Sequence, residues 1–419
     1  LEFGFEYERN SRSFYRVWGP DLWNLGRQLA NQHLQNKRYF IDDQTQWQFG
    51  EDFLIFSSEY IVSEEQYSTF GQNIRSQYDI PDNEWVYLDQ FTPNELSVDM
   101  FSADELMDNG NLPVYYYGYD YKGNPVSGSR VSFDEFLNET DENGNFSRRI
   151  SPFEPIYTAG YIQDKFFFDD IVFNVGVRVS RYDANQEVLK DKYSLLPVKT
   201  VQQVDASLNP NASLDINTGQ YSHPSNIGND FVVYANSITD QNQITGYRDG
   251  DNWYDANGLP ITDPSVLNLG SGVIPFLEDP DHVSKPNGGL TGDAFEDYTP
   301  EVMIEPRVSF NFPISDQAMF FAHYDILTQR PASSSRMNPY DFLYLASRAN
   351  DIQNPNLKME RTIDYEIGFK QALTDQSALQ ISAFYKNLKD MVQQERVNYA
   401  YPISYTHYNN IDFGNVKGF

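Results

Sequence analysis

Apolar and polar residues alternate along three long segments of this chain, and a turn of a few residues divides each segment into two strands. The three pairs of predicted strands are Ile156–Arg181, Ile304–Gln329 and Arg361–Val397. Their turns are predicted at Asp169-Asp170, near Pro313–Gln317 and near Ala372–Ser377. Much longer polar stretches separate the pairs. Short turns at one end of the strands and long loops at the other are typical of an outer-membrane β-barrel.

The strand from Ile171 to Arg181 is the most diagnostic. Five consecutive odd positions, Ile171 to Val179, are apolar, and the even positions between them are mostly polar, with Val172 as the exception. A tilted strand of about 9–11 residues is long enough to cross the hydrocarbon of a membrane. We therefore expect the apolar face to meet lipid and the polar face to line a lumen.

The preceding strand, Ile156–Phe168, does not reveal its outward face. Tyr157, Ala159 and Tyr161 compete for that role with Ile156, Gly160 and Ile162. The other strands alternate more clearly. The polar positions that the alternation assigns to the lumen are Asn174, Arg178, Ser180, Arg307, Asn311, Glu366 and Lys370. These residues would form a structural hydrogen-bond network, determine transport selectivity, or do both.

Further elements are predicted outside the three pairs. Strands are expected at Leu1–Glu8, Ser13–Trp18 and Ile411–Phe419, short helices at Pro20–Leu34 and Glu64–Tyr78, and a small hairpin at Val114–Tyr121 with a turn at Gly123-Asn124-Pro125. The prediction is an all-β fold: a partial transmembrane antiparallel barrel of about nine strands. Its large inserts, residues 19–155 and 184–303, would be extracellular loops that contain short helices.

Composition limits the class of protein. Mean hydropathy is -0.58, but a membrane barrel places its apolar residues at every second position, so the average does not exclude one. The net charge of -30 makes direct nucleic-acid binding unfavourable, because phosphate neutralisation needs cationic surface. The absence of cysteine excludes disulfides and thiolate chemistry. No apolar run is long enough for a transmembrane helix.

Several segments resemble the TonB-dependent receptors, the large outer-membrane transporters of Gram-negative bacteria. The matching hairpins are YTAGYIQDKFFFDDIVFNVGVRVSRYDAN, EPRVSFNFPISDQAMFFAHYDILTQRP and ERTIDYEIGFKQALTDQSALQISAFYKNLKDMV. The loop elements MFSADELMDNGN and YYGYDYKGN are similar to the subgroup with a carboxypeptidase-regulatory-like domain ahead of the plug. The three hairpins are the more specific part of this resemblance.

The resemblance implies a barrel of 22 strands, an N-terminal plug in its lumen and uptake driven by the TonB complex. No plug is recognisable in residues 1–419, and about nine strands cannot close such a barrel, because open edges in lipid leave backbone groups unpaired. We therefore expect one segment of a receptor barrel domain, truncated on both sides, with Phe419 not the true C-terminus. The expected location is the outer membrane of a Gram-negative bacterium.

The resemblance also implies the partners. These are outer-membrane lipid, the TonB complex acting through a plug outside this chain, a transported substrate, and an outer-membrane lipoprotein or other subunit. The substrate itself stays open between a small molecule such as a siderophore or a cobalamin-like compound, a glycan, a peptide and an exported protein.

The loops contain one crowded polar patch, YRDGDNWYDANG. Its oxygen-bearing side chains, Asp249, Asp251, Asp255 and Asn257, are candidate Ca²⁺ ligands. Asx turns explain the same residues without a metal, and no other cofactor is expected. Trp253 and Tyr254 beside them would stack on a ligand or instead pack the loop against itself. The five histidines lack metal-ligand spacing.

A second function class stays open beside the transporter. A secreted or surface-exposed β-rich protein that binds glycan or protein would share the strands and the aromatic loops. An enzyme is not expected, because neither a nucleotide-binding loop nor a nucleophile motif is present. Paired carboxylates of a glycosidase cannot be recognised from spacing alone.

Overall fold

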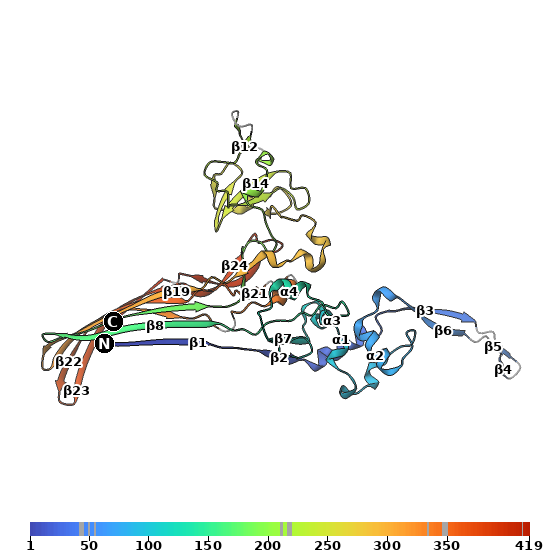
Figure 1. The fold of residues 1–419 in the computed structure, drawn as a ribbon, viewed down its shortest axis with the longest axis horizontal. Helices are drawn as coiled ribbons and strands as arrows, with labels where there is room; N and C mark the ends of the chain where they lie inside the picture. Colours follow the sequence, from blue (N-terminus) through green and yellow to red (C-terminus); the bar gives the residue numbers. More distant parts are fainter. Residues whose placement is uncertain are drawn as a thin grey trace. The chain divides into compact units, whose positions relative to one another are not determined.

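The computed structural model describes residues 1–41, 46–48, 51–53, 56–209, 213–215, 220–332, 335–345, 351–412 and 414–419. The chain divides into two compact units. The first unit comprises Leu1–Ser11, Ser132–Asp134 and Phe153–Phe419, and the second comprises Arg12–Val131 and Glu135–Pro152. Figure 1 traces both along the sequence. No helix in the described ranges combines the length and apolar character needed to span a bilayer.

The first unit is built on one eight-stranded antiparallel sheet. Its strands, in spatial order, are β1 (Glu2–Arg9), β8 (Ile156–Phe168), β9 (Ile171–Asp183), β19 (Glu301–Ser315), β20 (Ala318–Gln329), β22 (Glu360–Thr374), β23 (Ser377–Lys389) and β26 (Gly414–Gly418). The three predicted hairpins and their turns are confirmed. The turns are Asp169-Asp170, Asp316-Gln317 and Asp375-Gln376.

The pairing registers divide the side chains of this sheet between two faces, since directly paired residues in antiparallel strands point the same way. One face, called the apolar face here, carries Phe3, Phe5, Ile162, Val175, Val177, Ile304, Phe310, Phe320, Ile367 and Ile381 among others. The other, the polar face, carries the charged and amide residues. In β8 the register resolves the ambiguity of the sequence: Ile162 lies on the apolar face, and Tyr157 and Tyr161 lie on the polar face.

The sheet has eight described strands rather than the nine predicted. The predicted strand at Ser13–Trp18 forms as β2 (Phe14–Val17), but it pairs with β7 (Val114–Tyr117) in the second unit. Cross-strand ring pairs favour this partner: Phe14 stacks on Tyr117 with ring centroids 6.1 Å apart. The third predicted pair also ends earlier than expected. Asp390 adopts a positive φ of 54°, and the chain leaves the sheet there.

The second unit contains the predicted helices. They are α1 (Gly19–Leu29) and α2 (Thr69–Tyr78). Two further helices were not predicted: α3 (Ala103–Met107) lies in the same unit, and α4 (Phe133–Asn138) includes residues of both units. The pairs β3 (Leu34–Ile41) with β6 (Phe56–Val62) and β4 (Gln46–Gln48) with β5 (Glu51–Phe53) form two short ribbons. Phe70 stacks on Phe101 in the core of this unit, with centroids 4.1 Å apart. The predicted Gly123-Asn124-Pro125 turn is closed by a bridge between Tyr119 and Pro125.

The insert between β9 and β19 folds mainly as a five-stranded sheet. Its members are β13 (Val232–Ala235), β14 (Ile244–Asp249), β15 (Asn252–Asp255), β16 (Pro260–Ile261) and β17 (Ile274–Pro275). Val233, Ala235 and Tyr247 are among the buried residues of its core. We call residues 198–278 the insert lobe.

The remaining elements of the first unit are short. They are the pairs β10 (Glu187–Leu189) with β18 (Phe295–Asp297) and β11 (Ser213–Asp215) with β12 (Gln220–Ser222), the sheet β21 (Asp351–Ile352), β25 (Tyr405–Ile411) and β24 (Met391–Val397), and α5 (Pro339–Leu343).

Short 3₁₀ helices occur in both units. They lie at Glu64–Gln66, Leu88–Gln90, Pro93–Glu95, Val98–Met100, Asp108–Gly110, Val201–Gln203, Ala206–Leu208, Pro264–Leu267, His282–Ser284, Pro286–Gly289 and Gly292–Ala294.

Candidate functional site

The polar face of the large sheet carries all the residues that the sequence assigns to a lumen. Three come from β9, two from β19 and two from β22: Asn174, Arg178, Ser180, Arg307, Asn311, Glu366 and Lys370. The registers connect them through β20, because Arg307 pairs with Asp325 and His323 pairs with Glu366. One face of four neighbouring strands (β9, β19, β20 and β22) therefore gathers side chains that are up to 196 residues apart in the sequence (Asn174 to Lys370).

Two groups of polar contacts form on this face. Arg178 pairs with Glu6 of β1 and donates to the hydroxyl of Tyr157 at 3.1 Å. The same tyrosine donates to Ser180 at 3.1 Å. Further along, the Nδ2 of Asn174 donates to the hydroxyl of Ser309 at 3.1 Å. These contacts run between strands, so they fix the relative register of β1, β8, β9 and β19.

Other groups on the polar face have no partner in the described part of the chain. Arg307 and Lys370 form no ion pair with a described residue, and Arg307 lines a hollow of about 520 Å³ together with Lys165, Asn174 and His323. His323 lies 3.7 Å from a carboxylate oxygen of Glu366. The face therefore presents both cationic and mixed polar surface to whatever lies over it.

The predicted calcium ligands are not gathered into one site. Asp251 accepts a hydrogen bond from the hydroxyl of Tyr193 at 2.9 Å and pairs with Lys192 at 2.8 Å. Asp255 accepts from the backbone N–H groups of Asn257 and Leu259, which is an Asx turn. Across the described ranges, no cluster of three or more His, Asp or Glu residues could hold a metal ion.

The two aromatic residues of the same patch lie in packed surroundings. Trp253 is only 6% exposed, and its ring centroid lies 4.9 Å from Tyr234 and 5.1 Å from Tyr193. Tyr254 lies against Phe231, with centroids 5.5 Å apart. Stacking of Trp253 on a ligand, as the sequence suggested, would require its ring to leave this core. The alternative, in which the loop packs against itself, agrees with the observed contacts.

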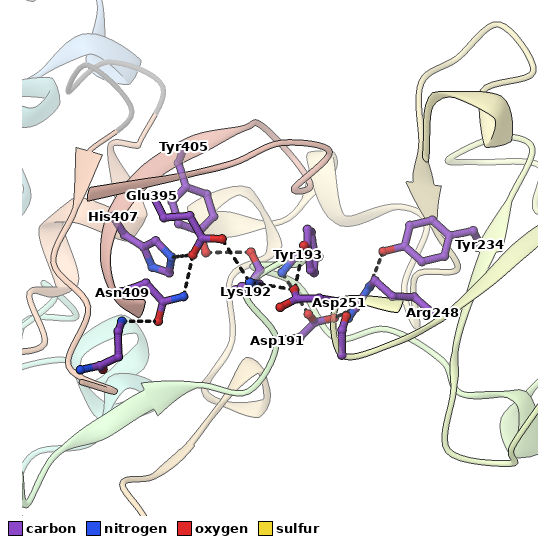
Figure 2. A network of polar contacts seen from close by, with 12 residues as sticks. Asp191, Lys192, Tyr193, Tyr234, Arg248, Asp251, Glu395, Tyr405, His407 and Asn409 are labelled. Carbon is purple, nitrogen blue, oxygen red and sulfur yellow. Dashed lines mark hydrogen bonds and ion pairs between the residues drawn. The ribbon is translucent and has the colours of Figure 1, made fainter. Parts of the chain in front are cut away.

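A polar network joins the insert lobe to β24 and β25 (Figure 2). Arg248 on β14 is 4% exposed, pairs with Asp191 and donates from Nε to the hydroxyl of Tyr234 at 2.9 Å. The ammonium group of Lys192 lies 2.8 Å from Asp251 and 3.4 Å from Glu395 of β24. Because Asp191 and Lys192 are neighbours, one short segment connects both sides of the network.

The network continues along β25. The Nδ2 of Asn409 donates to Glu395 at 2.6 Å, and His407 lies 3.4 Å from the same carboxylate. Burial lowers the pKa of His407, although the hydrogen bond to Glu395 opposes that change. Tyr405 is fully buried and donates to the backbone carbonyl of Lys192 at 2.7 Å. Burial also raises the pKa of Tyr405.

Sequence reasoning missed this network for a clear reason. Lys192 and Glu395 are 203 residues apart, and Asp191, Lys192 and Tyr193 lie outside any regular element. The strand that holds Arg248, ITGYRD, also contains threonine and aspartate, so its composition offered no signal that the arginine is buried. The polar face, in contrast, was visible in the period-2 pattern.

The eight-stranded sheet, apolar on one face and polar on the other, is a partial transmembrane β-barrel. Residues 217–419 match the family described as "TonB dependent receptor-like, beta-barrel". That range contains β19, β20, β22, β23 and β26, and the same sheet continues into β1, β8 and β9. Residues 217–419 are therefore part of a TonB-dependent receptor-like β-barrel, and the sheet that they share with β1, β8 and β9 is a segment of the same barrel.

A comparison with solved structures found several outer-membrane receptors, all at low similarity. They include a double mutant of the Serratia marcescens hemophore receptor HasR in complex with its hemophore HasA and heme (12% identity, TM-score 0.31, 64% of this chain and 31% of that chain). Others are the alcaligin outer-membrane receptor FauA from Bordetella pertussis (10%, 0.27, 64% and 26%) and the ferric-catecholate import receptor Fiu from K12 E. coli (13%, 0.25, 72% and 28%).

The chain thus spans less than a third of the length of these receptors. Their likeness is too low to carry any argument about substrate, so the assignment rests on the family match. A comparison with curated proteins found no match.

Proposed function

We propose that this chain forms part of the barrel of an outer-membrane receptor, which imports a substrate with energy supplied through the TonB complex. The apolar face of the sheet would contact lipid, and the polar face would line the lumen. The inserts would be extracellular and take part in substrate capture. The expected location is the outer membrane of a Gram-negative bacterium.

The exposed apolar face is the observation that carries this proposal. Phe3 is 79% exposed, Ile304 64% and Ile367 55%, on three different strands of one sheet. Leaving such side chains in water forfeits about 1.5–3 kcal/mol each. Soluble monomers rarely expose apolar patches beyond a few hundred Å². Lipid as the natural surrounding of this face removes that cost, and the polar face then needs an aqueous or protein-filled interior.

The edges of the sheet support the same proposal. β1 and β26 are the outermost described strands of the sheet. In lipid each unpaired backbone group at such an edge costs several kcal/mol. Strands contributed by the rest of a receptor would pair with both edges and close the barrel. A plug in the closed barrel would then lie against Arg307 and Lys370, the cations of the polar face that lack a described partner.

Single-cysteine labelling tests the orientation of the faces, since the sequence itself contains no cysteine. Cysteine would replace Ile304, Ile367 or Ile381 on the apolar face and Arg307, Glu366 or Gln380 on the polar face. Each variant of the intact receptor would be spin-labelled in lipid vesicles, and its accessibility to oxygen compared with that to a water-soluble nickel chelate. We expect oxygen to dominate at the three isoleucine positions and the chelate to be relatively favoured at the others.

Fractionation of cells that express the intact receptor provides the second readout. Recovery in the outer-membrane fraction, extractable only with detergent, is expected. A compact, detergent-free soluble protein with equal chelate access at both sets of positions would refute the proposal and favour a surface or secreted binding protein.

A further inference from the structure

A cleft of about 520 Å³ lies beside the polar network of Figure 2. Its walls come from the segment Leu189–Tyr193, the end of β14, the stretch Ile352–Asn356 and β25. Such a volume falls within the range of small-molecule sites. Aromatic and amide side chains are interspersed with charged ones along these walls.

The charges in and behind the walls balance one another. The cations are Lys190, Lys192 and Arg248, and the carboxylates are Asp191, Asp251 and Glu395. Arg248 is paired with Asp191, and Lys192 is held between Asp251 and Glu395. Lys190 donates to the backbone carbonyl of Asp293 at 2.7 Å. Burial favours the neutral form of His407 by lowering its pKa, so the histidine adds no charge at neutral pH.

This balance disfavours charged ligands. An anion that approached Lys192 would compete with Asp251 and Glu395, and a cation that approached Asp251 would compete with Lys192. In either case one partner of an existing ion pair would lose its counter-charge in a partly desolvated site, which is unfavourable. In a chain with a net charge of -30, such a locally neutral cleft is distinctive.

The polar groups still available in the cleft are amides. Among the described residues, the side-chain amides of Gln353 and Asn356 make no hydrogen bond, whereas Asn354 donates to the carbonyl of Tyr408 at 2.9 Å. An amide side chain both donates and accepts hydrogen bonds, as does a hydroxyl group. The rings of Tyr193 and Tyr405 also line the cleft and add apolar surface between the polar groups.

We propose that this cleft binds an uncharged ligand that carries several hydroxyl groups, which Gln353 and Asn356 hold by hydrogen bonds. The ion pairs in the wall disfavour charged ligands of similar size; they are formed by Asp191, Lys192, Arg248 and Asp251. The inference rests on the proposed receptor function, which places these segments outside the barrel where a substrate arrives. It adds the chemical class of the ligand and the residues that select it.

Calorimetric titration of the detergent-purified intact receptor with two matched sets of probes tests the ligand class. The neutral set is maltotriose, cellotriose, raffinose and triacetylchitotriose. The charged set is trigalacturonic acid and the deacetylated, cationic chitotriose. We expect at least one neutral trisaccharide to bind, and triacetylchitotriose to bind no more weakly than its cationic counterpart. Binding confined to the charged set, or no binding by any neutral probe, overturns the proposal.

Variants locate the site. Gln353→Ala and Asn356→Ala should each weaken the binding of a neutral probe about tenfold or more, because each removes a hydrogen-bonding group from the wall. The control is Gln202→Ala, which truncates an exposed glutamine outside the cleft. Equal affinity in all three variants would mean that the ligand binds outside this cleft and would refute the proposed site.

The failure of this inference can be told apart from failure of the receptor function. A receptor that keeps the lipid and lumen labelling pattern but binds no neutral probe would refute the ligand class alone. Loss of the labelling pattern in the unmodified receptor would refute the receptor function itself.

Discussion

The ring of Phe321 on β20 lies over Gly368, its registered partner on β22, and fills the space that a β-carbon at Gly368 would occupy. The same arrangement joins Tyr161 to Gly4 and Phe384 to Gly418. All three pairs lie on the polar face. Glycine thus lets a large ring lie flat along this face instead of projecting from it, which is a known way of pinning strand register.

Replacement of Gly368 by alanine should therefore destabilise the barrel. The new methyl group would overlap the ring of Phe321, and overpacking of this kind typically costs about 1–3 kcal/mol. The midpoint of chemical unfolding of the intact receptor in lipid vesicles measures the effect. Gly160→Ala is the matched control, since the nearest atom to a β-carbon there is a backbone oxygen at 3.9 Å. Combining Gly368→Ala with Phe321→Leu should recover part of the loss, and a purely additive result would contradict the explanation.

A lysine placed on the apolar face should be far more costly than one on the polar face. Ile367 lies near the middle of the apolar positions of β22, which run from Ile363 to Leu373. A cationic side chain facing the middle of the bilayer costs about 2–4 kcal/mol. Ile367→Lys should lower the unfolding midpoint and the amount of folded receptor in the outer membrane accordingly.

The control for that substitution is Gln163→Lys. Gln163 is exposed on the polar face and donates to Glu2 at 2.5 Å, so a lysine there would gain an ion pair. We expect a change within about 0.5 kcal/mol, the usual range for surface substitutions. Equal damage from both substitutions would mean that the two faces do not differ in their surroundings.

The sequence predicted the hairpins well because their alternation is direct evidence of two different environments. It could not orient β8, because small and aromatic residues occur on both of its faces. Only the pairing of Tyr161 with Arg178 settles that face. The strand at Phe14–Val17 was assigned to the wrong sheet, since its aromatic partners in β7 lie about 100 residues away. Long-range pairing of this kind leaves no local pattern.

The candidate sites also divide into those that the sequence could predict and those that it could not. The polar face was predictable residue by residue from parity. The network of Asp191, Lys192 and Glu395 was not, because it depends on how irregular segments meet in three dimensions. The patch around Asp255 was predicted in two alternative forms, and the turn geometry that the structure contains could have been inferred from a recurring pattern. DYKGN, DENGN and DANGL each place a glycine three residues after an aspartate.

These three loops share one hydrogen-bond arrangement. In each, the Oδ1 of the aspartate (Asp120, Asp141 or Asp255) accepts from the backbone N–H groups two and four residues later. The intervening glycine has φ of 80–89°, a conformation that suits glycine. The aspartates therefore act as turn-forming acceptors.

Asp255→Ala should loosen its loop by roughly 1–3 kcal/mol, because two hydrogen bonds to the carboxylate are lost at about 0.5–1.5 kcal/mol each. Asp255→Asn keeps an acceptor oxygen and should leave stability nearly unchanged. Hydrogen exchange of the amides of Asn257 and Leu259 measures the difference. Treatment with a calcium chelator should leave that exchange unaltered. A large loss in Asp255→Asn together with sensitivity to chelation would instead indicate a calcium ligand.

Acidification should weaken the packing of β24 and β25 around His407. The pKa of His407 is lowered in the folded protein, chiefly by burial. The unfolded chain, with an ordinary histidine pKa near 6.5, therefore binds more protons as the pH falls. Stability follows the difference in bound protons, so the contribution of His407 is complete above about pH 6.5 and decreases below it. His33 and His282 shift in the same direction and add their own share.

Hydrogen exchange in β24 and β25 between pH 7.5 and 5.5, corrected for the intrinsic exchange rate, measures this effect. This pH range separates the titration of the histidines from that of Glu395. Burial raises the pKa of Glu395, but the hydrogen bond from Asn409 and the charge of Lys192 lower it more, so the pKa lies below its usual value. His407→Gln should remove most of the pH dependence in these two strands, since glutamine cannot gain a proton there. His323→Gln on the polar face is the control and should leave the dependence intact. A pH response that survives His407→Gln unchanged would assign it to another group.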